Sequence, residues 1–207
     1  MSARLARRRT FLATGALIAL IVLAAPPTAV AETPLDELRR AFTIKGQPVP
    51  PEVFRDFGDG DLGDSGPIVV TIDVAAAIGS SRYGDEVKRS GAWLRQSHPA
   101  ANTLNGAEET RYEFVGRTTR GLLVALASYS GGGSGVFTTL HVLDAAAMPA
   151  FDTAGNVYQR VDLTVLRSVP LGDRWEGEVR ISGDAIHIAT ARTPALGAPT
   201  TIEARRP

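Results

Sequence analysis

Cysteine is absent from this chain of 207 residues. Its absence excludes disulfide bonds, thiolate nucleophiles, iron–sulfur clusters, cysteine zinc sites and a lipid anchor built on an N-terminal cysteine. Aromatic residues are also scarce, at 6%, whereas hydrophobic residues make up 44% of the chain. A domain of this size without disulfides must be stabilised by burial of apolar side chains, and the hydrophobic content is sufficient for that.

An excess of either charge is lacking as well, because 22 basic residues face 22 acidic ones. Four of the basic residues and none of the acidic residues lie in the first 31 positions, so residues 32–207 carry a net charge of about −4. A mildly acidic surface does not attract nucleic acid or anionic lipid. We therefore predict no nucleic-acid partner, and contact with a membrane only during export.

The N-terminal segment has the pattern of a cleavable signal peptide. Four arginines fall within its first ten residues, an uncharged apolar run extends from Phe11 to Ala25, and the segment closes on Ala29-Val30-Ala31. Basic, apolar and small-x-small regions in this order are typical of signal peptides. The apolar run is shorter than the ~20 residues of a membrane-spanning helix. We predict cleavage after Ala31 and a periplasmic or secreted location, with an uncleaved anchor as the alternative.

Two export routes remain open. Arg8-Arg9 followed by Thr10-Phe11-Leu12 resembles the core of a twin-arginine signal, which exports proteins that have already folded. Arg7 and Ala13 depart from that pattern, and no basic residue lies between the apolar run and the cleavage site. The general secretory route is therefore an equal alternative.

A single short helix is expected directly after the signal. Thr33 can cap it and Pro34 fits the first helical position. Asp36 and Arg40, four residues apart, are expected to pair on its exposed side. Gly46 and the prolines that follow end the helix, so residues 32–51 are predicted to form a helix with a proline-rich linker.

Residues 52–207 are expected to form one all-β domain. Short segments with period-two alternation and turn residues between them predict roughly eight to nine strands, whereas a repeated strand–helix–strand spacing is not found. We predict a single antiparallel β-sandwich or barrel; residues 85–95 could alternatively be helical, and 98–107 and 193–199 are expected to be loops. The expected strands are residues 68–74, 92–96, 111–117, 122–130, 136–143, 157–169, 175–182, 185–191 and 200–204.

A glycine-rich stretch between two of these strands is the first candidate site. It lacks the Gly-Lys-Ser/Thr of a phosphate-binding loop, and Val136 occupies the position where a nucleophile elbow would require glycine. The stretch is therefore predicted to be a hairpin loop, whose bare backbone could contact a ligand or partner, with Tyr129 and Phe137 framing the contact. Its residues are Tyr129, Ser130, Gly131, Gly132, Gly133, Ser134 and Gly135.

An acidic cluster is the second candidate. Four aspartates lie between residues 56 and 64, and carboxylate oxygens are the ligands that calcium prefers. The helix–loop–helix calcium pattern fails, because the positions that require glycine and glutamate hold other residues. A solvated acidic turn is the main interpretation, and a non-standard calcium loop with Asp59, Asp61 and Asp64 as ligands is the alternative. No other cofactor is predicted.

No catalytic constellation is marked in the sequence. His98, His141 and His187 are far apart, and a metal site would require two of them to converge with a carboxylate. Gly91-Ala92-Trp93 resembles the short Gly-x-Trp signature of lipocalin-type barrels, which hold small apolar ligands. We therefore expect a non-catalytic envelope or secreted module that binds a protein or small ligand, with a hydrolase acting on envelope glycan or ester, and a carrier of small apolar ligands, as alternatives.

Overall fold

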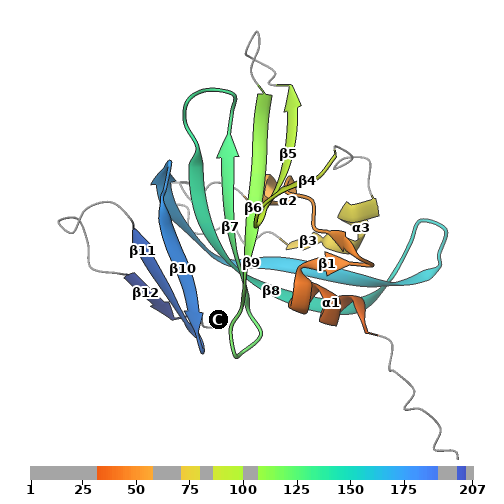
Figure 1. Ribbon diagram of the computed structural model, residues 1–207. Helices are drawn as coiled ribbons and strands as arrows, with labels where there is room; N and C mark the ends of the chain where they lie inside the picture. Colours follow the sequence, from red (N-terminus) through yellow and green to blue (C-terminus); the bar gives the residue numbers. More distant parts are fainter. Residues whose placement is uncertain (1–31, 58–70, 80–85, 100–106, 191–199, 204–207) are drawn as a thin grey trace, which may run out of the picture. The chain divides into compact units, whose positions relative to one another are not determined.

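The computed structural model describes residues 32–57, 71–79, 86–99, 107–190 and 200–203, all within one compact unit, Glu32–Pro207. The described part is mostly β-structure in antiparallel sheets, with three small helices (Figure 1). The expectation of an all-β antiparallel domain is thereby confirmed. The expectation of one helix is wrong, because two further short helices occur. Within the described residues, no helix has both the length and the apolar character needed to span a bilayer.

Seven strands form the main sheet, in the order β3-β9-β8-β7-β6-β5-β4. From β4 to β9 each strand pairs with the next one along the chain, and β3 pairs with the outer side of β9. Helical segments from the N-terminal part lie along one side of this sheet (Figure 1). The strands are β3 (Thr71–Asp73), β4 (Lys88–Ser90), β5 (Trp93–Pro99), β6 (Ala107–Arg117), β7 (Leu123–Ser130), β8 (Phe137–Phe151) and β9 (Val157–Asp173).

The remaining long-range pairing is a three-stranded sheet of β10 (Gly177–Ser182), β11 (Ala185–Thr190) and β12 (Thr200–Glu203). The predicted turn at Gly183-Asp184 joins β10 to β11, with Ser182 opposite Ala185. Gly183 adopts a positive φ of 64°, a conformation that glycine accepts without steric cost.

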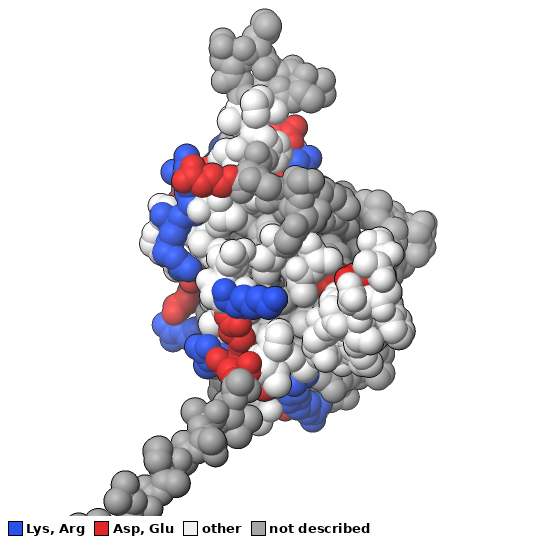
Figure 2. All heavy atoms as spheres, turned by 90° about the vertical axis from the view of Figure 1, so that its right-hand side faces the viewer, with Lys and Arg blue, Asp and Glu red and all other residues white. Residues whose placement is uncertain are grey.

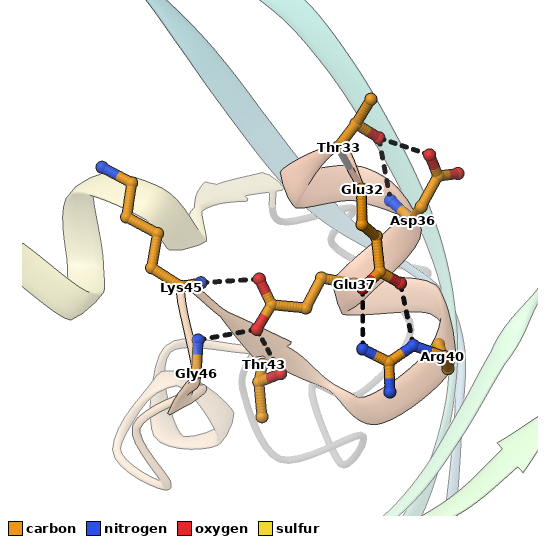
Figure 3. A network of polar contacts seen from close by, with 8 residues as sticks. All are labelled: Glu32, Thr33, Asp36, Glu37, Arg40, Thr43, Lys45 and Gly46. Atoms are coloured by element: carbon orange, nitrogen blue, oxygen red, sulfur yellow. Dashed lines mark hydrogen bonds and ion pairs between the residues drawn. The ribbon is translucent and has the colours of Figure 1, made fainter. Parts of the chain in front are cut away.

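Helix α1 (Pro34–Ala41) begins as predicted, because the Thr33 hydroxyl accepts a hydrogen bond from the Asp36 backbone N–H at 3.2 Å. The predicted pairing of Asp36 with Arg40 is wrong. The Asp36 carboxylate accepts a hydrogen bond from the Thr33 hydroxyl at 2.6 Å, and Arg40 pairs with Glu32 at 2.8 Å (Figure 3). Both partners precede the helix, so Thr33 is held at its first turn and Glu32 is held by a residue of its last turn.

Glu37 ties α1 to the small hairpin of β1 (Thr43–Ile44) and β2 (Gln47–Pro48). Its carboxylate accepts hydrogen bonds from the Thr43 hydroxyl at 2.8 Å and from the backbone N–H groups of Lys45 and Gly46 at 2.7 Å each (Figure 3). These bonds favour the ionised carboxylate and lower the pKa of Glu37 below its ordinary value. One side chain thus fixes the turn that follows the helix.

Two helices that the sequence patterns did not predict follow the hairpin. Helix α2 (Val53–Asp56) begins after a proline pair, and the Glu52 backbone N–H that precedes it donates to the buried Gln96 side chain of β5 at 3.0 Å. Helix α3 (Val74–Gly79) begins at Val74, the last residue of the expected strand 68–74, and Asp73 accepts the backbone N–H groups of residues 75 and 76 at 3.1 Å.

Apolar side chains cover both faces of the main sheet. The larger cluster joins α1, α2 and α3 to one face, and Tyr112 and Leu123 are among its fully buried members. The second cluster lies on the opposite face and joins Leu140 and Val142 of β8 to Ile186 of the three-stranded sheet. Alternation of side chains along each strand explains this division, because successive residues point to opposite faces.

The β8–β9 hairpin is longer than predicted and projects beyond the rest of the sheet (Figure 1). Its distal end carries exposed apolar side chains: Phe151 is 74% exposed and its cross-strand partner Val157 is 66% exposed. Figure 2 faces the side to which this hairpin projects and shows charged side chains gathered mainly on the left of the view. Strands β5 and β6 also extend into the expected 98–107 loop, so its first two residues and its last are in strands.

Candidate functional site

A pocket of about 250 Å³ lies where helix α2 covers the ends of β6, β7 and β8. Its lining combines aromatic rings, hydroxyl groups, one imidazole and one guanidinium group. No carboxylate is among the described residues that line it. The lining residues are Phe54, Arg55, Thr110, Ala127, Ser128, Tyr129, Phe137, Thr139 and His141.

The register of the sheet places these side chains together. Tyr129 of β7 pairs with Thr110 of β6 on one side and with Phe137 of β8 on the other, so the three lie in one row across the strands. Ala127 and Thr139 pair in the row behind. Directly opposite residues of antiparallel strands have their Cβ atoms about 5 Å apart. Residues distant in sequence are thereby brought within the span of one small ligand.

The glycine-rich stretch forms the hairpin connection between β7 and β8, as predicted, and Tyr129 and Phe137 face each other at its base. Its far side is held by the end of β9. Asp173 accepts the Val136 backbone N–H at 2.7 Å, and Arg174 donates to the Ser134 carbonyl at 2.8 Å. The glycine-rich loop therefore borders the pocket, and hydrogen bonds to Asp173 and Arg174 hold its C-terminal end in place.

Phe137 is the exposed wall of the pocket, with 57% of its surface accessible. Gly135 lies against its ring: a Cβ atom at this position would come within 2.9 Å of the Phe137 Cε2 atom. Glycine at position 135 therefore leaves room for the ring. The sequence predicted only that Tyr129 and Phe137 would flank a contact. The structure places the Phe137 side chain in the wall of the pocket.

His141 lies deeper in the lining and is 2% exposed. Its ring packs near Phe54 and Phe57, with ring centroids 5.4 and 6.1 Å away, and its Nδ1 atom is 3.0 Å from the Ser168 hydroxyl. Burial lowers the pKa of His141 to about 4, because desolvation disfavours the imidazolium ion. The ring is neutral at pH 7, and its two nitrogens can then provide one donor and one acceptor.

The three histidines do not converge. His187 is exposed on β11 and contacts the Thr201 hydroxyl at 3.2 Å, and His98 lies on β5 beside Arg55. Among the described residues, no group of three or more histidine, aspartate or glutamate side chains is suited to a metal ion. Asp59, Asp61 and Asp64 lie outside the described residues, so the calcium hypothesis stays a prediction.

Arg55 forms the charged rim of the pocket. Its guanidinium lies 3.0 Å from Glu108 and 3.4 Å from Glu52, and it also lies over the Tyr129 ring at 5.2 Å from the ring centroid. Partial burial acts to lower the pKa of Arg55, but attraction by the two carboxylates outweighs this effect and raises it. His98 Nε2 completes the cluster at 2.9 Å from the guanidinium.

Two buried hydroxyl groups near the pocket have no hydrogen-bond partner among the described residues: those of Thr110 and Tyr112. Both side chains lie on the pocket side of β6, but only Thr110 lines the pocket. A buried hydroxyl group without a partner can form a further hydrogen bond with a group that comes within reach. A rotation about χ1 of Thr110 exchanges its hydroxyl and methyl groups, so this side chain can present either to the pocket.

Six residues of the described lining were not indicated as site residues by the sequence patterns: Phe54, Arg55, Thr110, Ala127, Ser128 and Thr139. The strand pattern that contains Tyr112 and Phe114 places Thr110 on the same face, so this signal was available. Phe54 and Arg55 carry no comparable signal, because they reach the pocket only through the packing of α2.

A second and more open hollow of about 790 Å³ lies between the end of β6 and strand β10. Its charged members are Arg117 and Arg180, and Arg180 is already paired with Glu178 at 2.6 Å. The hollow is larger but largely open to solvent, and the hydroxyl of Thr118, the buried polar residue of its described lining, already accepts the Leu122 backbone N–H at 3.1 Å. The smaller pocket is therefore the stronger candidate.

Comparison of the chain with protein-family models, with curated proteins and with solved structures found no match. The functional inference therefore depends on the chemistry of the pocket itself.

Proposed function

We propose that residues 32–207 form an exported, non-catalytic binding module that holds a small ligand in the pocket at the base of the glycine-rich loop. The observation that carries this proposal is the pairing of Tyr129 with Phe137. The two rings stand at the ends of the loop and line the same cavity of about 250 Å³. Ligand pockets combine apolar walls with a few polar groups that fix orientation, and this lining has that composition.

Binding fits the described lining better than the alternatives. Glycoside hydrolysis commonly requires two carboxylates beside the scissile bond. The two carboxylates next to this pocket, Glu52 and Glu108, are both paired with the Arg55 guanidinium, and neither is among the described lining residues. Transport of an apolar ligand would favour an apolar cavity, whereas this one includes hydroxyl groups, a buried imidazole and the Arg55 guanidinium. The same lining supports a binding role for the module as a whole, within a β-sandwich formed by the two sheets.

Export with removal of the first 31 residues is part of the proposal. Its basis is the order of basic, apolar and small-x-small regions in residues 1–31, which is typical of cleavable signal peptides.

Native mass spectrometry of the protein purified from the envelope fraction of its own host tests this proposal. We expect the mass of residues 32–207 together with an adduct of one small molecule. The variant Phe137→Ala should lose the adduct, because it removes a wall of the pocket. Phe151→Ala is the matched control: it removes an exposed phenylalanine from the same strand, outside the pocket, and should retain the adduct.

A bare chain mass in the wild-type protein would overturn the proposed ligand site. A mass that still includes residues 1–31 would overturn the proposed cleavage, whatever the adduct shows.

A further inference from the structure

The charges around the pocket do not favour an anionic ligand. Arg55 is the one charged side chain among the described lining residues, and Glu52 and Glu108 both lie within 3.4 Å of its guanidinium. The side chains of these two carboxylates are only 12% and 18% exposed, so solvent screens them incompletely. A carboxylate or phosphate entering beside Arg55 would meet two negative charges for one positive charge. These charges therefore disfavour an anionic ligand, and the remaining polar groups of the lining decide between the other classes.

Apart from the Arg55 guanidinium, the polar groups of the described lining are neutral, and each can form hydrogen bonds as a donor or as an acceptor. His141 is an uncharged imidazole at pH 7, and Thr110 and Thr139 supply hydroxyl groups. The Thr110 hydroxyl is buried and has no partner among the described residues, so it gains a hydrogen bond if a ligand supplies one. A ligand with several hydroxyl groups matches this set.

The walls add flat apolar surface beside these polar groups. Tyr129 and Phe137 present aromatic rings at the mouth, and Phe54 packs at the inner end. Aromatic side chains contribute large apolar contact area in a defined orientation. The volume of about 250 Å³ is below the range of about 300–1,000 Å³ found for drug-sized ligands, and it suits a single ring.

We propose that the ligand is a neutral sugar ring. A pyranose has an apolar C–H face that fits against Tyr129 and Phe137 and a hydroxylated edge that can reach Thr110 and His141. The inference rests on the proposed binding function and adds the chemical class of the ligand. It requires no reaction, because the sugar is held and released unchanged.

Saturation-transfer NMR and calorimetry test this inference on the protein purified from its host's envelope fraction. The probes are neutral methyl hexosides and N-acetylglucosamine, with glucuronic acid as a charged sugar of similar size. We expect the neutral sugars to bind and glucuronic acid to bind at least several-fold more weakly. Phe137→Ala should weaken binding about tenfold or more, since it removes a stacking wall.

Thr110→Val preserves the shape of the side chain and removes the hydroxyl group. We expect it to raise the dissociation constant about fivefold, the effect of one lost hydrogen bond. Tyr112→Phe is the matched control, because it removes the other unpartnered hydroxyl of β6 from the same face but outside the pocket lining. Tyr112→Phe and Phe151→Ala should leave the dissociation constant unchanged.

The outcomes separate this inference from the function on which it rests. If an adduct is retained in the pocket but no neutral sugar binds, the sugar assignment is wrong and the binding site stands. If glucuronic acid binds as tightly as the neutral sugars, the charge argument is wrong. If sugars bind to Phe137→Ala and to Thr110→Val as tightly as to the wild-type protein, they bind outside the pocket and the inference is overturned. If neither an adduct nor sugar binding is found, both proposals fail.

Discussion

His141 shows how one buried side chain links the pocket to the stability of the protein. The lining of a ligand site commonly contains polar groups that the fold must desolvate, and desolvation has a measurable effect on their protonation. His141 is enclosed by Phe54 and Phe57 and keeps one hydrogen bond, to Ser168. The folded state therefore favours the neutral form of the His141 ring.

The dependence of the free energy of unfolding on pH tests whether the folded state favours neutral His141. The pKa of His141 is about 4 in the folded protein, against an ordinary value of 6.5. Between these values the unfolded chain binds a proton that the folded chain does not, so the free energy of unfolding falls as the pH falls from 6.5 toward 4. The full loss is roughly 3 kcal/mol, at 1.36 kcal/mol for each unit of pKa difference.

The measurement is urea denaturation at pH values from 7.5 to 4.5, in the wild-type protein and in His141→Gln. Glutamine does not titrate, so the variant should show a smaller loss of stability over this range. An equal loss in both proteins would show that His141 is not protonated preferentially in the unfolded state.

At the scale of elements, the connection of α1 to the β1–β2 hairpin depends on Glu37. Its carboxylate accepts three hydrogen bonds, from Thr43, Lys45 and Gly46. Lys45 and Gly46 both adopt positive φ values, of 53° and 75°. The bonds therefore hold a turn whose backbone conformation is unfavourable for lysine.

Glu37→Gln is expected to lower the free energy of unfolding by about 1 kcal/mol at pH 7, because the amide replaces one acceptor oxygen with a donor. The pKa of Glu37 is lowered in the folded state, so this contribution is present above the ordinary carboxyl value of 4.5 and is lost as the pH falls through the lower folded-state value. The difference between wild type and variant should therefore shrink in acid. Denaturation curves at pH 7 and pH 3 measure it, and a difference that is constant or larger at pH 3 would contradict the assignment.

The elements also show what the sequence could and could not predict. Alternation placed the cores of β6, β7, β9 and β11 correctly, and turn residues identified the hairpins at residues 131–136 and 183–184. Strand β8 continues to Phe151 through an alanine-rich stretch that has no apolar alternation. Pro149 is accommodated there because, beyond Leu143, β7 no longer pairs with β8, so a missing N–H is tolerated at this edge.

Some residues of the candidate site could be predicted from the sequence, and others could not. The glycine-rich turn indicated that Tyr129 and Phe137 stand at the two ends of one hairpin loop. The turn also fixes which residues of the two strands lie opposite each other. Arg55 and Phe54 belong to a four-residue helix, too short for any helical periodicity to show. Their place in the site depends on long-range contacts such as Arg55 with Glu108, which no local pattern contains.

At the scale of the whole molecule, the protein lacks disulfides and depends on two apolar layers, one on each face of the main sheet. The layer between the two sheets contains Ile186, which is fully buried, together with Leu140 and Val142 of β8. The pocket lies on the other face, beneath α2. Packing on one face and binding on the other can therefore be perturbed separately.

Ile186→Ala tests this separation. It removes a fully buried side chain between the sheets, and large-to-small substitutions of this kind cost about 2–5 kcal/mol. We expect urea denaturation to show a loss in that range, while Phe151→Ala, at a site that is 74% exposed, changes the free energy of unfolding by no more than about 0.5 kcal/mol. The adduct in the pocket should be retained by the folded fraction of Ile186→Ala, because no residue of β11 lines the pocket. A loss no larger than that of the exposed control would mean that the three-stranded sheet does not pack on the main sheet as described.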